Sequence, residues 1–207
     1  MVRVKICGIT SVDDARLAVS AGADALGLVF APSPRRLSPD SAAAILASVP
    51  PFVTPVAVFV DASLDPILDL TAALGISTVQ LHGGESPELV NLLRAHGLKV
   101  IKAFRVASSS DLDHLDRFHP DAFLLDSRVP DKLGGTGLAF DWSLAVPIAA
   151  RLPVILAGGL NPDNVADAVR TVRPYAVDCS SSVESAPGRK DPDKLRTFVS
   201  RAKSALS

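Results

Sequence analysis

The stretch Val4-Lys5-Ile6-Cys7-Gly8-Ile9-Thr10 decides how the rest of the chain is interpreted. Its β-branched first half predicts a buried strand that ends at Gly8. The hydroxyl of Thr10 or Ser11, ahead of two aspartates, predicts the N-cap of a helix that follows directly. Cys7 therefore stands where a strand ends and a loop begins, which is where an α/β barrel carries its chemistry.

The order of strand and helix in this first unit repeats along the whole chain. The predicted strands are Val2–Cys7, Ala25–Phe30, Val53–Val60, Thr78–Leu81, Lys99–Phe104, Ala122–Asp126, Val154–Ala157 and Ala176–Cys179. The predicted helices are Val12–Ala21, Pro39–Ser48 capped by Ser38, Leu64–Leu74 stopped by Gly75, Glu85–Ala95, Ser109–Arg117, Trp142–Ala150, a helix capped by Asn161 that runs to Val172, and Pro192–Leu206.

Strands that read as continuous apolar runs fit a parallel sheet that is buried on both faces. Eight strand–helix units in 207 residues predict a single-domain α/β fold, a (β/α)8 TIM barrel that spans residues 1–207. A doubly wound sheet would have fewer strands and a glycine-rich turn after its first strand, whereas the paired glycines here follow the fourth and seventh strands.

Composition excludes several classes of function. The formal net charge is -1, from 21 basic and 22 acidic residues that are interspersed, so neither nucleic acid nor a membrane surface is an expected partner. The longest apolar runs have the length of strands, and the first strand starts too early for a signal peptide, so we expect a cytoplasmic protein. We expect no disulfide between Cys7 and Cys179 in that compartment, and no metal, because the histidines lack ligand spacing.

Polar residues collect where the predicted strands end, which is the rim on which a barrel builds its active site. The loops after the seventh and eighth strands contain Gly158-Gly159 and Ser180-Ser181-Ser182. Glycines allow close backbone approach and amides at a helix start favour an anion, so these two loops predict a phosphate site. The alternative is that Gly158-Gly159 is only a tight turn and that the three serines form a flexible loop. The glycine-rich segment Lys132–Gly137 has three alternative interpretations. It is a third anion-contacting loop, which would include Gly135, or a mobile lid over the site, or a plain linker.

Two of these rim residues suit acid–base chemistry. Asp126 ends a hydrophobic strand, where partial desolvation would raise the pKa of its carboxyl and suit it to donate a proton, although an aspartate here also caps or pairs with loops. Cys7 fits either a base or a small buried hydrophobic residue. Together, beside a phosphate site, they predict an acid and a base acting on one sugar phosphate. One of Arg35 and Arg36 can point inward as a partner for a carboxylate, and His82 either contacts substrate or is structural.

Five segments together resemble the phosphoribosylanthranilate isomerase family of tryptophan biosynthesis, in order from residue 4 to about residue 190. They are Lys5-Ile6-Cys7-Gly8-Ile9-Thr10, Gln80-Leu81-His82-Gly83, Gly134-Gly135-Thr136-Gly137 with Phe140-Asp141-Trp142, Ala157-Gly158-Gly159-Leu160, and Val177-Asp178-Cys179-Ser180-Ser181-Ser182-Val183-Glu184. One departure is visible: the family usually has glycine where this chain has Ser182, for which we expect a local adjustment of the loop.

The resemblance implies a cofactor-free Amadori rearrangement of N-(5-phosphoribosyl)anthranilate. Asp126 would act as the general acid on the furanose ring oxygen, and Cys7 as the general base that removes the proton from C2 of the sugar. Arg36 would bind the anthranilate carboxylate, and Lys5 and His82 would contact the substrate. Gly158, Gly159, Ser180 and Ser181, with Gly135 as a further candidate, would bind the phosphate. Lys5 or a nearby dipole would lower the pKa of the Cys7 thiol.

Other functions stay open on the sequence alone. Another phosphosugar isomerase of the same barrel class is one, and a non-catalytic phosphosugar-binding barrel is another. An epimerase would need metal-binding residues at the strand ends, and indole-glycerol-phosphate synthase a Lys/Glu catalytic set. The sequence favours a monomer over a homodimer, and it leaves open whether an aminoaldose of histidine biosynthesis is also accepted.

Overall fold

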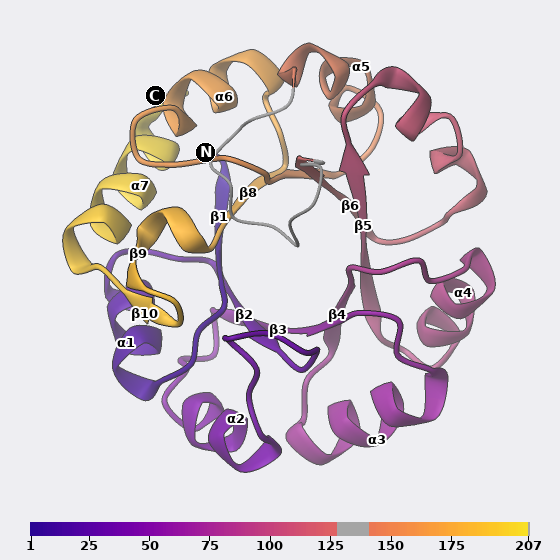
Figure 1. Ribbon diagram of the computed structural model, residues 1–207, viewed down its shortest axis with the longest axis vertical. Helices are drawn as coiled ribbons and strands as arrows, with labels where there is room; N and C mark the ends of the chain where they lie inside the picture. The colour runs from indigo at the N-terminus through magenta and orange to yellow at the C-terminus, as the bar shows by residue number, and fades with distance from the viewer. Residues whose placement is uncertain (128–140, 207) are drawn as a thin grey trace.

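The computed structural model describes residues 1–127 and 141–206, and its centre is a closed ring of eight parallel strands (Figure 1). The strands follow one another around the ring in chain order, and the last pairs with the first. They are β1 (Arg3–Cys7), β2 (Ala25–Val29), β3 (Thr54–Phe59), β4 (Thr78–Leu81), β5 (Lys99–Val106), β6 (Ala122–Ser127), β7 (Val154–Leu156) and β8 (Ala176–Cys179). The (β/α)8 TIM barrel predicted from the sequence is confirmed.

Helices surround this ring on its outside (Figure 1). They are α1 (Val12–Ser20), α2 (Pro39–Leu46), α3 (Leu64–Leu74), α4 (Pro87–Ala95), α5 (Val146–Ala149), α6 (Val165–Val172) and α7 (Pro192–Ser204). The hydroxyls of Ser11, Ser38 and Ser86 accept a backbone hydrogen bond at the starts of α1, α2 and α4, which pairs an amide that the first turn leaves free. Among the described residues, no helix has the length and apolar character needed to cross a bilayer.

The start of α4 differs from the prediction because Glu85 has another use. The sequence predicts a helix from Glu85, but α4 begins at Pro87. The Glu85 carboxylate accepts hydrogen bonds from the amide of Gly83 at 3.0 Å and from the ammonium of Lys102 at 2.8 Å. Both Glu85 and Lys102 are buried, so this pair fixes the loop after β4 instead of extending the helix.

The predicted cap of α6 is also displaced. The side chain of Asn161 accepts hydrogen bonds from the amides of Asp163 and Asn164, at 2.8 and 3.1 Å, and closes a turn of its own. The helix then begins at Val165, with Asn164 at its N-cap position. Asparagine side chains commonly bond the backbone two or three residues on in this way, so a cap signal and a turn signal look alike in sequence.

The helices predicted after β5 and β6 are wrong in form. The segment Ser109–Arg117 forms two short 3₁₀ turns, η1 (Ser109–Leu112) and η2 (Leu115–Arg117), because its serine and aspartate side chains bond the nearby backbone. The segment Trp142–Ala150 divides into η3 (Trp142–Leu144) and α5, since Pro147 lacks the amide that would continue one helix.

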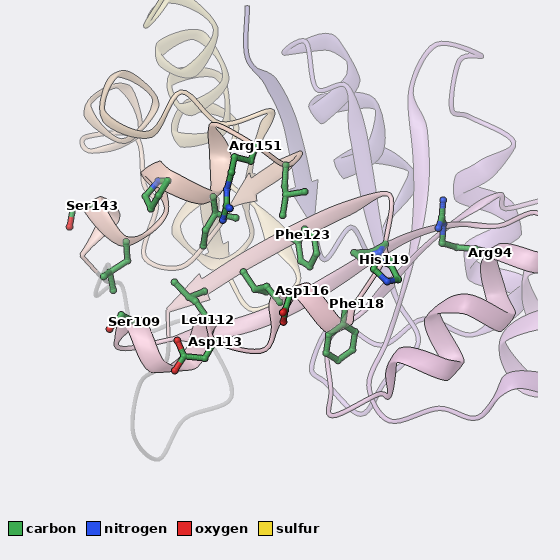
Figure 2. A pocket seen from close by; sticks show the side chains of 16 residues that line it. Arg94, Ser109, Leu112, Asp113, Asp116, Phe118, His119, Phe123, Ser143 and Arg151 are labelled. Atoms are coloured by element: carbon green, nitrogen blue, oxygen red, sulfur yellow. The ribbon is translucent and has the colours of Figure 1, made fainter.

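A cavity of about 870 Å³ lies on the outer wall between these short turns, as Figure 2 shows. Its lining includes Leu112, Phe118 and Phe123. Phe123 belongs to the core between the strands and the helices, so this cavity is outside the ring and separate from the residues at the strand ends.

The interior of the ring combines an apolar cluster with three buried polar side chains. Because side chains alternate between the two faces of a strand, every second residue points inward. The apolar cluster consists of Val56, Ile101, Ala103, Ala122, Leu124, Ile155, Ala157 and Ala176. The same alternation brings Lys5, Gln80 and Asp178 inward, and all three are buried. Each polar residue lies two positions before a rim residue, so the interior supports the rim with hydrogen-bonding groups.

A small hairpin after β8 was not predicted. Ser181–Val183 forms the 3₁₀ turn η4, and the chain then makes two antiparallel strands, β9 (Glu184–Ala186) and β10 (Arg189–Lys190). The turn between them is Pro187-Gly188, in which Gly188 has a φ of 79°. The hairpin packs against the start of α1, where the amide of Lys190 donates to the carboxylate of Asp14.

Candidate active site

The register of β1 with its two neighbours determines the surroundings of Cys7. Cys7 lies opposite Gly27 on β2, and Lys5 lies opposite Asp178 on β8. The Lys5 ammonium donates to the Asp178 carboxylate at 2.9 Å, and both side chains are almost fully buried. Cys7 is 9% exposed at the end of its strand. The thiol therefore faces the barrel mouth with a buried ion pair directly beneath it.

Burial raises the pKa of the Cys7 thiol above its ordinary value, because it disfavours the thiolate. The positive charges of Lys5 and Lys190 oppose that rise, and the negative charge of Asp178 adds to it. The predicted influence of Lys5 thus has the expected sign, but the expected net lowering is wrong. Burial also acts to lower the pKa of Lys5, yet Asp178 and Cys7 raise it overall, so Lys5 stays charged beside the thiol.

Asp126 lies at the rim end of β6 and touches His82 from the end of β4. Its Oδ2 is 3.2 Å from Nε2 of His82, and each side chain is 20% exposed. On its other side, a Cβ added at Gly158 would come within 2.8 Å of Asp126 Oδ1, so glycine is what allows the loop after β7 to pass this carboxylate. Asp126 is thereby held between His82 and the first of the two predicted phosphate loops.

The two arginines after β2 have different surroundings. Arg35 donates to both carboxylate oxygens of Glu184, at 2.8 and 2.6 Å, and its side chain packs over Gly8. Arg36 is exposed and makes no ion pair with any described residue. Arg35 is therefore held by an ion pair within the fold, whereas the guanidinium of Arg36 has no such pair within residues 1–127 and 141–206.

The loops after β7 and β8 offer backbone donors. Gly158 and Gly159 have φ values of 74° and 68°, which place both in the left-handed region that favours glycine. Within residues 1–127 and 141–206, neither of their amides donates a hydrogen bond. Ser180 occupies the N-cap position of η4, Ser181 is its first residue, and the Ser180 hydroxyl lies beside Gly8. Consecutive amides in such a conformation can form a concavity suited to an anion.

Ser182, where the resemblance implied a glycine, fits this loop without backbone strain. The described non-glycine residues with positive φ are Asp61 and Arg173, so Ser182 has an ordinary backbone conformation. Its hydroxyl donates to the carbonyl of Leu160 and contacts the sulfur of Cys179. The side chain therefore ties the loop after β8 to the loop after β7.

Sequence reasoning missed Lys190 and its role at this rim. Its ammonium donates to the carbonyls of Cys7 and Ser180, at 2.7 and 3.2 Å, and to Glu184 at 2.9 Å. Burial acts to raise the pKa of Glu184, but Arg35 and Lys190 lower it overall, so its carboxylate stays charged. The signal was the Pro187-Gly188 pair, which is typical of a turn between two short strands.

The remaining sequence predictions concern residues elsewhere. Gly135 lies outside the described residues, together with the rest of the Lys132–Gly137 loop. Cys7 and Cys179 are both free thiols, and burial raises the pKa of Cys179 to about 12. Among the described residues, no group of three or more His, Cys, Asp or Glu side chains could hold a metal ion.

Gly27 provides the space that the Cys7 thiol occupies, and this leads to a first prediction. A Cβ at Gly27 would lie 2.7 Å from Cys7 Sγ and 3.1 Å from Lys5 Nζ. We expect Gly27→Ala to displace the thiol and to lower kcat roughly 10- to 100-fold, because a misplacement of about 1 Å has that order of effect. Steady-state kinetics and thermal unfolding would measure the two consequences.

Gly84→Ala is the matched control, because a Cβ there meets nothing closer than 3.7 Å. We expect it to keep the kcat of the wild type. A Gly27→Ala protein with unchanged kcat would contradict the close packing of thiol and strand.

Known proteins match this chain over nearly its full length. The family model described as N-(5'phosphoribosyl)anthranilate (PRA) isomerase matches residues 4–201. The N-(5'-phosphoribosyl)anthranilate isomerase of Geobacter sulfurreducens is 52% identical over 204 residues, which cover 98% of this chain and 99% of that protein. The crystal structure of phosphoribosyl anthranilate isomerase from Thermotoga maritima is 45% identical, has a TM-score of 0.91, and covers 98% of this chain and 99% of its own.

A second solved structure holds a ligand. It is a phosphoribosyl anthranilate isomerase in complex with reduced 1-(o-carboxyphenylamino)-1-deoxyribulose 5-phosphate. It is 43% identical with a TM-score of 0.87, and covers 98% of this chain and 99% of its own. By sequence and fold, this chain belongs to the N-(5'-phosphoribosyl)anthranilate isomerase family.

Proposed function

We propose that this protein catalyses the Amadori rearrangement of N-(5'-phosphoribosyl)anthranilate to 1-(2-carboxyphenylamino)-1-deoxyribulose 5-phosphate in tryptophan biosynthesis. The observation that carries the proposal is the arrangement of one rim. In the closed ring, β7 and β8 are the two strands between β6 and β1. The loops that would bind the phosphate therefore lie between Asp126 and Cys7, with one end of this arc at Gly158 and the other at Ser180.

Asp126 begins the reaction as general acid. It donates a proton to the furanose ring oxygen while the bond from that oxygen to C1 breaks. The lone pair of the anthranilate nitrogen forms the new C1–N double bond, which gives an iminium ion. His82 supports this step, because its Nε2 lies 3.2 Å from the carboxylate that Asp126 becomes.

Cys7 continues as general base in its thiolate form. It removes the proton from C2, and the electrons of that C–H bond form a C1–C2 double bond while the iminium nitrogen becomes neutral. The resulting enolamine loses its hydroxyl proton and gains a proton at C1, which gives the ketone. The electron pair returns to the substrate carbon skeleton, so no oxidant or reductant is consumed.

Binding uses groups that the fold leaves available. The phosphate would accept hydrogen bonds from Gly158, Gly159, Ser180 and Ser181, and Arg36 would pair with the anthranilate carboxylate. Lys5 is 2% exposed and paired with Asp178, so we propose that its charge acts on the Cys7 thiol above it and not on the substrate directly.

The phosphoribosylanthranilate isomerase of Thermotoga maritima is described as dimeric. We propose that this chain is a monomer in the cytoplasm, and light scattering would measure its mass in solution.

The test is an assay in D₂O with purified protein and N-(5'-phosphoribosyl)anthranilate, followed by NMR. We expect the ketone product with deuterium at C1. The dephosphorylated substrate is the control, and its kcat/KM should fall on the order of 100-fold, because hydrogen bonds to a charged group are lost. An enzyme that leaves the phosphorylated substrate unchanged would refute the proposed function. Equal rates with both substrates would refute the phosphate site alone.

A further inference from the structure

Gln80 is a buried polar residue that the mechanism above does not use. It lies on β4, two residues before His82, and is 1% exposed inside the barrel. Its Nε2 is 2.7 Å from Nδ1 of His82. Its Oε1 makes no hydrogen bond with any described residue. A buried amide costs free energy unless it is hydrogen-bonded. The one hydrogen bond that the Gln80 side chain makes among the described residues is to the imidazole of His82, so we look for its role there.

The chemistry of the amide determines which nitrogen of the imidazole carries the proton. Nε2 of glutamine has only hydrogens to offer, so Nδ1 of His82 must accept with its lone pair. A neutral imidazole then carries its proton on Nε2, which faces Oδ2 of Asp126. With the amide reversed, its buried NH₂ group would have no acceptor among the described residues, and Nδ1 of the imidazole would have to carry the proton. The observed orientation leaves one acceptor oxygen unpaired, whereas the reversed one would leave two buried N–H donors unpaired.

We propose that Gln80 is a positioning residue that holds His82 as its neutral Nε2–H tautomer, so that His82 donates to Oδ2 of Asp126. This inference rests on the proposed function, in which Asp126 is the acid. With Oδ2 occupied as an acceptor, the transferable proton of Asp126 is held on Oδ1. When that proton leaves, the Nε2–H group stabilises the negative charge that remains.

Loss of the Gln80 donor would remove this control. The imidazole could then move its proton to Nδ1, and the lone pair of Nε2 would face Asp126. In that form Nε2 accepts the carboxyl proton instead of stabilising the carboxylate, which opposes proton donation to the substrate. The effect on kcat therefore arises through the tautomer of His82, with little change in substrate binding.

The test is ¹⁵N NMR of protein with ¹⁵N-labelled imidazoles, together with steady-state kinetics. The signals of His82 are assigned by their loss in His82→Asn. In the wild type, at a pH where the imidazole is neutral, we expect an unprotonated Nδ1 and a protonated Nε2. In Gln80→Met, which has a similar size and no donor, part of the population should carry its proton on Nδ1. There kcat should fall roughly tenfold with KM nearly unchanged, the effect of one lost hydrogen bond.

Thr78→Val is the matched control, because Thr78 lies two residues earlier on the same inward face of β4. It should leave both the tautomer and kcat unchanged. A protonated Nδ1 in the wild type would overturn the proposal even if Gln80→Met fails to fold, and so would a Gln80→Met protein with the wild-type tautomer and kcat. The NMR signals need no turnover, so a wild type with the expected tautomer and no isomerase activity would refute the proposed function separately.

Discussion

Replacing Asp126 with asparagine is expected to lower kcat by about 10²- to 10⁴-fold, the range that a general acid contributes. Asparagine keeps the shape of the side chain and can still accept a hydrogen bond from His82, but it has no proton to give to the ring oxygen. KM should change little, because the phosphate and carboxylate contacts remain. Steady-state kinetics with N-(5'-phosphoribosyl)anthranilate would measure both parameters.

The same substitution at Asp121 provides the control. Asp121 lies directly before β6, at the opposite end of the barrel, where it pairs with Lys99 at 3.0 Å and Arg94 at 3.3 Å. Asp121→Asn should keep the wild-type kcat and reduce the free energy of unfolding by less than about 1 kcal/mol, as expected for exposed ion pairs. An Asp126→Asn protein with a kcat near that of the control would rule out Asp126 as the acid.

Replacing Cys7 with alanine is expected to reduce kcat by a similar ~10²- to 10⁴-fold, and the pH profile should identify the group that is lost. A base acts only when deprotonated. Because burial raises the pKa of Cys7, the thiolate forms at higher pH than an ordinary thiol, whose pKa is about 8.5. In the wild type, kcat/KM should therefore rise with pH through the alkaline range.

That alkaline rise should disappear in Cys7→Ala and persist in Cys179→Ala. Cys179 lies on the outer face of β8 and its thiol pKa is raised to about 12, so it takes no part in this range. Measurement of kcat/KM from about pH 6 to 10 would cover the expected limb. A rise of unchanged size and position in Cys7→Ala would mean that another group is the base.

The barrel itself could be predicted because its signal is local and repeated. Each strand is an apolar run, and the polar residue that ends it, such as Cys7 or Asp126, falls on the same rim by the topology of the fold. The short turns after β5 could not be predicted in this way. A segment such as Ser109–Arg117 has enough apolar residues for a helix. Whether it forms an α-helix or short 3₁₀ turns depends on hydrogen bonds from its side chains that compete for the backbone.

The residues that support the site were harder to find, because their partners are distant in sequence. Lys5 and Asp178 are neighbours only through the register of β1 with β8. Lys190 reaches Cys7 only because an unpredicted hairpin turns it back toward α1. The period of two along β1 and β4 does indicate that Lys5 and Gln80 share a face with Cys7 and His82. A local pattern therefore finds which residues face the interior, and the tertiary structure decides which of them pair.

The bond from Lys190 to the carbonyl of Cys7 spans 183 residues of sequence, which has a consequence for the order of events during synthesis. Contacts between distant parts of a chain form late, because a large loop must close first. When β1 to β7 have left the ribosome, most of the barrel wall has been made. Asp178, which pairs with Lys5, and Lys190, which binds the carbonyl of Cys7, have not yet been made. The charged surroundings of the Cys7 thiol are therefore complete only after β8 and β10 have joined the barrel. In an incomplete chain, Cys7 lacks the charges of Asp178 and Lys190.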